Sequence, residues 1–171
     1  MEKVIINDDN ISEKDIDKTV NKVRAILLVG DKLLVSHYAG VILLPGGGVE
    51  KGETDDQAII RELQEEIGIT YDINDLEKML LIEHYQHNFP TRDNETINRL
   101  VRTKFYLGDF RGIDLTKCKR TESEIRDNFY LELMSIEDFM NSVNEISSNP
   151  RKKYFDKENQ DTIKMLKMIS S

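Results

Sequence analysis

A glycine-rich loop that runs directly into an amphipathic helix is the feature that most constrains how this chain folds. Residues 44–69 read LPGGGVEKGETDDQAIIRELQEEIGI. Thr54 and Gln57 have the spacing of a capping box, and Gly68 is placed to end a helix predicted over 54–67. One stripe of this helix is aliphatic and must face a core, and its members are Ile59, Ile60, Leu63 and Ile67.

Three carboxylates, Glu62, Glu65 and Glu66, share a second stripe of the same helix. Like charges at this spacing repel one another, and hard divalent cations prefer oxygen ligands, so the stripe is predicted to hold Mg²⁺ or Mn²⁺. For an arbitrary string of this kind, a solvated acidic face is the commoner outcome. The glycines of 46–48 favour the metal site, because they allow the backbone to approach a ligand closely.

The loop and helix together resemble the signature of the Nudix hydrolase family. Gly47 is followed after five residues by Glu53 and after seven more by Arg61-Glu62-Leu63. The segment then ends with Glu65-Glu66, Gly68 and the aliphatic Ile69, so every constrained position is filled. Identities fixed at set spacing are far more specific than a lone glycine-rich string. The resemblance covers residues 47–69 and no other part of the chain.

This resemblance implies an α/β/α sandwich around a central mixed β-sheet. It also implies hydrolysis of a diphosphate linkage between a nucleoside diphosphate and another moiety. Divalent cations assist such chemistry by neutralising phosphate charge and lowering the pKa of a bound water. The implied cofactor is Mg²⁺, with Mn²⁺ as an alternative.

The resemblance also assigns roles to individual residues. Glu62, Glu66 and the Gly46 carbonyl are implied metal ligands. Glu65 is a further ligand or the group that deprotonates water. Arg61 and Glu53 are expected to form an ion pair that supports the helix and loop, with an ordinary surface pair as the alternative.

Some members of the family carry the general base on a loop before the last strand. Glu122 and Glu124 fall in the corresponding part of this chain. Either is a candidate for the base or for an additional ligand, and a solvated loop carboxylate is the commoner outcome for each.

Substrate-binding candidates lie in the predicted strands. Arg102 and Lys104 alternate with apolar neighbours, so both are candidates to face the phosphates, with a solvent-facing basic pair as the alternative. Tyr85 is a candidate to stack on a nucleobase, with a packed core tyrosine as the alternative.

The three histidines are not predicted to be primary metal ligands. His84 and His87 are three apart in a predicted strand, which places them on opposite faces. His37 has no carboxylate or histidine at a useful spacing.

The rest of the pattern predicts one mixed α/β (α+β) domain over residues 1–171, because strands and helices do not alternate strictly. Residues 1–20 are predicted to form a surface strand or arm. Segments 23–29 and 32–38 are predicted to form a hairpin, and 77–89 and 97–107 to be strands joined by a loop over 88–95. A strand over 129–134, a short helix capped by Ser135 and a helix from Pro150 to about 169 complete the prediction.

Composition limits the partners. Lys and Arg number 24 against 32 Asp and Glu, a net charge of −8 that argues against broad binding to a nucleic-acid backbone. The single Cys118 excludes an intramolecular disulfide. No signal peptide or membrane span is visible, so a cytoplasmic protein without a membrane partner is expected. The expected partner is a small nucleotide, and a homodimer is possible.

Three functional hypotheses remain. The first is a Mg²⁺-dependent pyrophosphohydrolase acting on a nucleotide or nucleotide derivative. The second is removal of pyrophosphate from a capped or triphosphorylated 5′ RNA end, which the net charge disfavours. The third is a nucleotide sensor of the same fold without hydrolysis, which the complete set of carboxylates disfavours.

Overall fold

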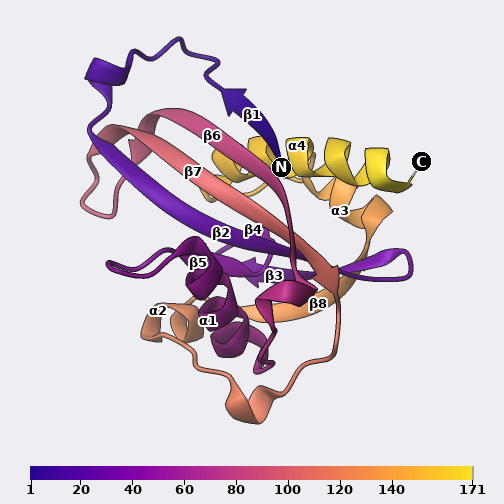
Figure 1. Ribbon diagram of the computed structural model, residues 1–171. Helices are drawn as coiled ribbons and strands as arrows, with labels where there is room; N and C mark the ends of the chain where they lie inside the picture. The colour runs from indigo at the N-terminus through magenta and orange to yellow at the C-terminus, as the bar shows by residue number, and fades with distance from the viewer. Residues whose placement is uncertain (171) are drawn as a thin grey trace.

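The computed structural model describes residues 1–170 and arranges them around a mixed sheet of eight strands (Figure 1). The strands are β1 Glu2–Ile6, β2 Lys18–Val29, β3 Lys32–Tyr38, β4 Val41–Leu43, β5 Gly46–Gly48, β6 Glu77–Pro90, β7 Thr96–Asp109 and β8 Tyr130–Ser135. Their order is β1-β6-β7-β2-β3-β4, with β5 paired to β2 and β8 paired to β3. The pairs β1–β6 and β2–β7 are parallel, whereas β6–β7 and β2–β3 are antiparallel.

Helices cover both faces of this sheet (Figure 1). The α-helices within residues 1–170 are α1 Asp55–Ile67, α2 Glu122–Arg126, α3 Ile136–Ser142 and α4 Lys152–Ser170, and short 3₁₀ turns occur at Glu13–Asp15, Ile73–Asp75 and Leu115–Lys117. α1 packs on one face, and α3 and α4 pack on the other. None of these helices is long and apolar enough to cross a membrane.

The central strand β2 contributes to the hydrophobic core on both faces. Successive side chains of a strand point to opposite faces. Val23, Ala25 and Leu27 therefore pack toward α1, while Ile26 packs toward α4. The two cores confirm the predicted mixed α/β sandwich.

The predicted hairpin is present, with β2 and β3 joined across Gly30-Asp31 and Leu28 paired to Leu33. β2 begins earlier than expected, at Lys18, because its first half pairs in parallel with β7. The segment 1–20 contains β1, which adds to the sheet beside β6.

Two predicted boundaries are wrong. β6 continues through Pro90, so the loop predicted over 88–95 is shorter than expected. A bulge between Gln86 and Phe89, with Asn88 at φ 50°, restores the pairing so that Phe89 lies opposite Ile97. α4 begins at Lys152 rather than Pro150, because the Asn149 side chain accepts a hydrogen bond from Arg151 N and holds a turn there.

Candidate active site

The caps of α1 determine where its carboxylates lie. The Thr54 hydroxyl accepts a hydrogen bond from Gln57 N at 3.2 Å, and Thr54 N donates to the Gln57 side chain at 2.9 Å. Gly68 ends the helix at φ 74°, where a Cβ would collide with neighbouring backbone. Leu63 and Ile67 are fully buried on the sheet side. The acidic stripe is therefore turned toward the glycine loop.

The glycine loop packs directly on this stripe. Gly46 has φ 142°, and a Cβ on it would collide with the Val23 carbonyl. A Cβ on Gly47 would collide with the Glu62 carboxylate. A side chain at position 46 would push the loop away from β2, so glycine is required there, whereas a side chain at position 47 would displace the Glu62 carboxylate.

Glu66 is the most deeply placed of the three carboxylates, with 6% of its surface exposed. Its side chain accepts a hydrogen bond from Gly46 N at 3.1 Å. Burial raises the pKa of Glu66 to about 8, although the nearby Arg24 acts in the opposite direction. A buried carboxylate of this kind is stabilised in its charged form by a cation.

Arg61 lies among the other carboxylates. Its guanidinium donates to both oxygens of Glu53, at 2.7 and 3.1 Å, and also to Glu62 at 3.0 Å and to Glu65 at 3.3 Å. These hydrogen bonds hold the pKa of Glu53 below its ordinary value, whereas burial raises the pKa of Glu62. Arg61 also donates to the Gly48 carbonyl at 3.0 Å, so it joins the helix to the loop.

The Gly46 carbonyl faces Arg24, a residue that the sequence analysis did not single out. Arg24 Nη1 donates to Gly46 O at 2.8 Å and to Leu44 O at 3.1 Å. A carbonyl oxygen has two lone pairs, so this hydrogen bond leaves one available to a metal ion. The pairing of β2 with β5, which places Arg24 opposite Gly46, is the reason for the contact.

A cavity of about 180 Å³ opens beside these groups. Arg24, Gly46, Glu66 and Glu124 are among the residues that line it. Glu124 belongs to α2, where its carboxylate accepts a hydrogen bond from Thr121 N at 2.7 Å. The structure thus brings Glu124 to Glu66 across the cavity.

Glu122, the other candidate on this segment, lies exposed in the first turn of α2 and does not line the cavity.

Arg120 is a second residue that the sequence analysis missed. Its guanidinium donates to the Glu65 carbonyl at 3.2 Å and to the Glu66 carbonyl at 2.7 Å, and it stacks on Phe129 with 4.4 Å to the ring centroid. It therefore satisfies carbonyl groups at the C-terminal end of α1 and joins that end to the segment that carries α2. No local signal in the sequence marks this contact, because Arg120 and Glu66 are 54 residues apart.

Arg102 and Lys104 lie on the α1 face of the sheet but away from the cavity. Lys104 pairs with Asp55 in the first turn of α1 at 2.5 Å, and Arg102 pairs with Glu83 at 3.6 Å. The structure does not bring either one to Glu66, and their role in substrate binding stays a prediction.

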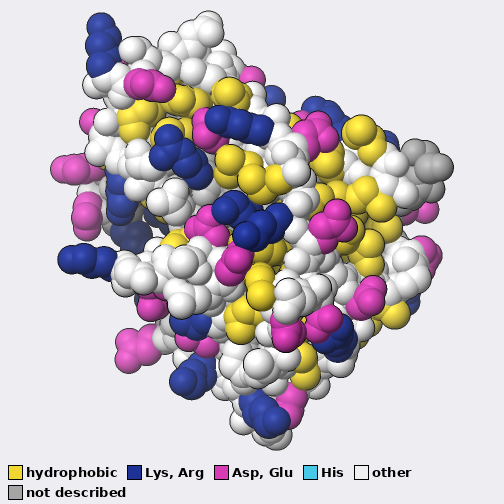
Figure 2. Space-filling model, in the orientation of Figure 1, with side chains coloured by type: hydrophobic (Ala, Val, Ile, Leu, Met, Phe, Trp, Pro, Cys, Tyr) yellow, Lys and Arg dark blue, Asp and Glu magenta, His cyan; other side chains and the backbone are white. Residues whose placement is uncertain are grey.

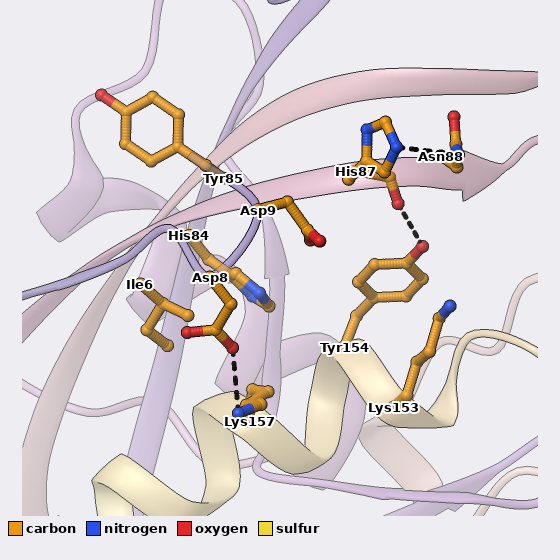
Figure 3. Close-up of a pocket in the computed structure, with 10 residues that line it drawn as sticks. All are labelled: Ile6, Asp8, Asp9, His84, Tyr85, His87, Asn88, Lys153, Tyr154 and Lys157. Atoms are coloured by element: carbon orange, nitrogen blue, oxygen red, sulfur yellow. Dashed lines mark hydrogen bonds and ion pairs between the residues drawn. The ribbon is translucent and has the colours of Figure 1, made fainter. Parts of the chain in front are cut away.

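Tyr85, His84 and His87 contribute to a different cavity, of about 230 Å³, between β6 and α4 (Figure 3). The Tyr85 ring points away from this cavity in the close-up, so stacking on a nucleobase also stays a prediction. His84 Nδ1 is 3.5 Å from Glu158, and His37 Nε2 is 2.6 Å from Glu132.

The oxygen donors around Gly46 fit a hard divalent cation. Glu62, Glu65, Glu66 and the Gly46 carbonyl are all oxygen ligands of the type that Mg²⁺ and Mn²⁺ prefer. Over residues 1–170, no three Asp, Glu, His or Cys side chains are already arranged as a metal centre. Arg61 contacts one oxygen of Glu62 and one oxygen of Glu65, so the second oxygen of each carboxylate is left for a metal ion.

Comparison with known proteins gives the context for this geometry. The family model described as the NUDIX domain matches residues 18–156. An 8-oxo-dGTP diphosphatase of Proteus vulgaris is 41% identical over 66 residues, which are 39% of this chain and 54% of that protein. An ADP-ribose pyrophosphatase of Methanocaldococcus jannaschii is 41% identical over 54 residues, 32% of this chain and 31% of that protein. The matched segment thus spans about half of the length of the first relative and about a third of the length of the second.

Solved structures show the same fold. An ADP compounds hydrolase has a TM-score of 0.55 at 16% identity, covering 87% of this chain and 71% of that one. The NUDIX domain of Shewanella oneidensis NrtR, complexed with ADP ribose, has a TM-score of 0.54 at 15% identity and covers 95% of both chains.

Proposed function

Because this chain belongs to the NUDIX domain family, we propose that it is a metal-dependent pyrophosphohydrolase that cleaves a diphosphate linkage in a nucleotide or nucleotide derivative. The hydrogen bond from Gly46 N to the buried Glu66 carboxylate carries this proposal, because it holds the loop carbonyl beside the acidic stripe. Relatives named as 8-oxo-dGTP diphosphatase and ADP-ribose pyrophosphatase support a small nucleotide as the substrate.

In this proposal the residues of the acidic stripe and the glycine loop bind the metal ion. Glu62, Glu65, Glu66 and the Gly46 carbonyl would hold Mg²⁺ or Mn²⁺. When bound, the cation neutralises phosphate charge and lowers the pKa of a water molecule. The water oxygen forms a bond to one phosphorus, the bond from that phosphorus to the bridging oxygen breaks, and the released phosphate group keeps the electron pair.

The proton of the attacking water passes to a carboxylate, and Glu124 is the better placed candidate for this base. It lines the same cavity as Glu66, on a segment joined to α1 through Arg120. Its carboxylate accepts a hydrogen bond from Thr121 N, which occupies one of its lone pairs and leaves others for water. Glu65 is the alternative base, and one oxygen of its carboxylate already accepts a hydrogen bond from Arg61.

The two other hypotheses receive less support. On the face shown in Figure 2, Lys and Arg side chains are interspersed with Asp and Glu and form no continuous basic channel for an RNA strand. A sensor that does not hydrolyse its ligand would have no need of the complete acidic stripe, which this chain keeps on α1.

A substrate screen tests the proposal. Nucleoside triphosphates, dinucleoside polyphosphates, nucleotide sugars and ADP-ribose are incubated with Mg²⁺ or Mn²⁺, and phosphate and pyrophosphate release is measured. We expect release from at least one class of compound. Glu66→Gln should lose this activity, whereas Glu137→Gln, which changes an exposed residue on α3, should retain it. Failure to hydrolyse any of these compounds with either metal would overturn the proposal.

A further inference from the structure

A group of cationic side chains extends from the active site across the sheet face that α4 covers. Arg24 and Lys22 project from β2 on that face, and Arg99 projects from β7. Arg151 approaches from the turn before α4. Lys22 interacts electrostatically with all three arginines and with one carboxylate, Glu158, so positive charge is in excess.

The three arginines have partners of their own. Arg24 donates to backbone carbonyls of the glycine loop, Arg151 Nε donates to the Pro90 carbonyl at 3.1 Å, and Arg99 Nε donates to the Gln86 side chain. Within residues 1–170 the Lys22 ammonium has no hydrogen bond, and no carboxylate lies within 4.0 Å of it. It lies 5.5 Å from the centre of the Phe155 ring and is partly exposed to solvent.

Thr103, which neighbours Lys22 in the sheet, also carries a polar group without a hydrogen-bond partner. The Thr103 hydroxyl is fully buried and makes no hydrogen bond with any residue that the structure describes. β2 and β7 pair in parallel with Lys22 directly opposite Thr103, so both side chains lie on the α4 face of neighbouring strands. Two neighbouring residues on one face, an ammonium and a hydroxyl without hydrogen-bond acceptors, are the groups that would bind a ligand with oxygen atoms.

We propose that Lys22 and Thr103, with Arg24 and Arg99 beside them, form a subsite for a phosphate group of the substrate other than the linkage that is cleaved. This inference rests on the proposed function for the identity of the ligand. Arg24 belongs to both places, because it also lines the cavity with Glu66. Arg24 thus connects Lys22 with the cavity in which the diphosphate would bind, as a subsite for the same substrate molecule requires.

The electrostatic environment of Lys22 also favours a bound anion. Burial, followed by the charge of Arg24, lowers the pKa of Lys22 to about 7. An anion beside Lys22 would offset that unfavourable interaction.

Phosphate binding tests the subsite without any need for turnover. Sodium phosphate is titrated into the metal-free protein at pH 6.5 by calorimetry, with sodium chloride at equal ionic strength as the reference. We expect Lys22→Met to weaken phosphate binding at least about fivefold and Lys22→Arg to stay within about threefold of the parent. Lys32 is an exposed lysine on β3. Lys32→Met is therefore the matched control and should leave phosphate affinity unchanged.

Thr103→Val separates a binding role from a structural one. Its hydroxyl is unpaired in the free protein, so the Tm of the free protein should hold or rise while phosphate affinity falls. A Tm loss with unchanged phosphate affinity would overturn the role of Thr103. Equal phosphate binding in the parent and in Lys22→Met, or no binding beyond the chloride reference, would overturn the subsite.

Kinetics then identify the source of the phosphate. With a nucleotide that the screen shows to be hydrolysed, we expect Lys22→Met to raise KM and leave kcat within about twofold, because the subsite binds without taking part in the chemistry. Phosphate binding that depends on Lys22 but leaves KM unchanged would overturn the assignment to the substrate. If no nucleotide is hydrolysed, the proposed function fails, and the assignment of the phosphate to a substrate fails with it.

Discussion

Gly46 and Glu66 are joined by a 3.1 Å hydrogen bond from the backbone amide of the loop to the buried carboxylate of α1. The bond spans two elements that are 20 residues apart in the chain. It fixes the loop carbonyl next to the acidic stripe, and it places one deeply buried negative charge where a cation would stabilise it.

Replacing Glu66 should separate activity from stability. Glu66→Gln keeps the side-chain size and can still accept the hydrogen bond from Gly46 N, but it removes the charge. We expect kcat to fall on the order of 10²-fold or more, about 2.7 kcal/mol in the transition state, because an amide is a weak ligand for a hard cation. The Tm of the metal-free protein should hold or rise. A kcat within about threefold of the parent at saturating Mg²⁺ would show that Glu66 is not a ligand of the catalytic metal ion.

The stability of the free protein should depend on pH through Lys22. The pKa of Lys22 is lowered from 10.5 to about 7 in the folded chain. Between these values Lys22 binds more protons in the unfolded chain, so its contribution to the free energy of unfolding rises as pH increases from about 7 toward 10. Glu66, whose pKa is raised to about 8, has the opposite dependence up to about pH 8, so the effect of Lys22 is measured as the difference between the parent and Lys22→Met, in which the contribution of Glu66 cancels.

Urea denaturation at pH 7 and pH 9, in buffer without phosphate, measures this dependence. Because Lys22 is partly exposed, we expect a contribution of roughly 1–2 kcal/mol. The difference in unfolding free energy between Lys22→Met and the parent should shrink toward higher pH. A difference that is the same at both pH values would contradict the lowered pKa.

The local features of the fold were predictable from the sequence, because they depend on neighbouring residues. The capping box of Thr54, the stop at Gly68 and the cap at Ser135 are present as expected. The bulge at Asn88 was not visible, since it depends on how β6 and β7 align over their length. The loop over 88–95 was therefore predicted too long.

The candidate site was predictable only in part, for a related reason. The spacing on α1 predicts that Glu62, Glu65 and Glu66 share a stripe, but Arg24 and Arg120 reach the site through strand pairing and through a distant loop. Sequence periodicity carries no information about such contacts.

Removing the metal should abolish activity without unfolding the protein. We expect turnover to require Mg²⁺ or Mn²⁺ and to stop in excess EDTA. The fold should survive, because its cores consist of apolar residues between the sheet and the helices rather than of metal ligands. Activity assays and circular dichroism on the same samples check this. Full turnover in EDTA, or loss of the helical signal with it, would contradict the prediction.

A pair of neighbouring glutamates on α2 tests which carboxylate accepts the proton. Glu124 lines the cavity with Glu66, whereas Glu122 is exposed in the same helix and serves as the matched control. We expect Glu124→Gln to lower kcat by about 10²-fold with little change in Mg²⁺ affinity, because a general base contributes roughly that factor and is not required to hold the cation. Glu122→Gln should leave both quantities unchanged.

The amide that Glu124→Gln introduces cannot take a proton, but it can still accept the hydrogen bond from Thr121 N that caps α2, so the helix should remain in place. Mg²⁺ affinity is measured by calorimetry, and kcat is measured under conditions in which the chemical step limits the rate. A loss of Mg²⁺ affinity equal to the loss of kcat would make Glu124 a metal ligand. An unchanged kcat would return the role of base to Glu65, whose second carboxylate oxygen does not contact Arg61.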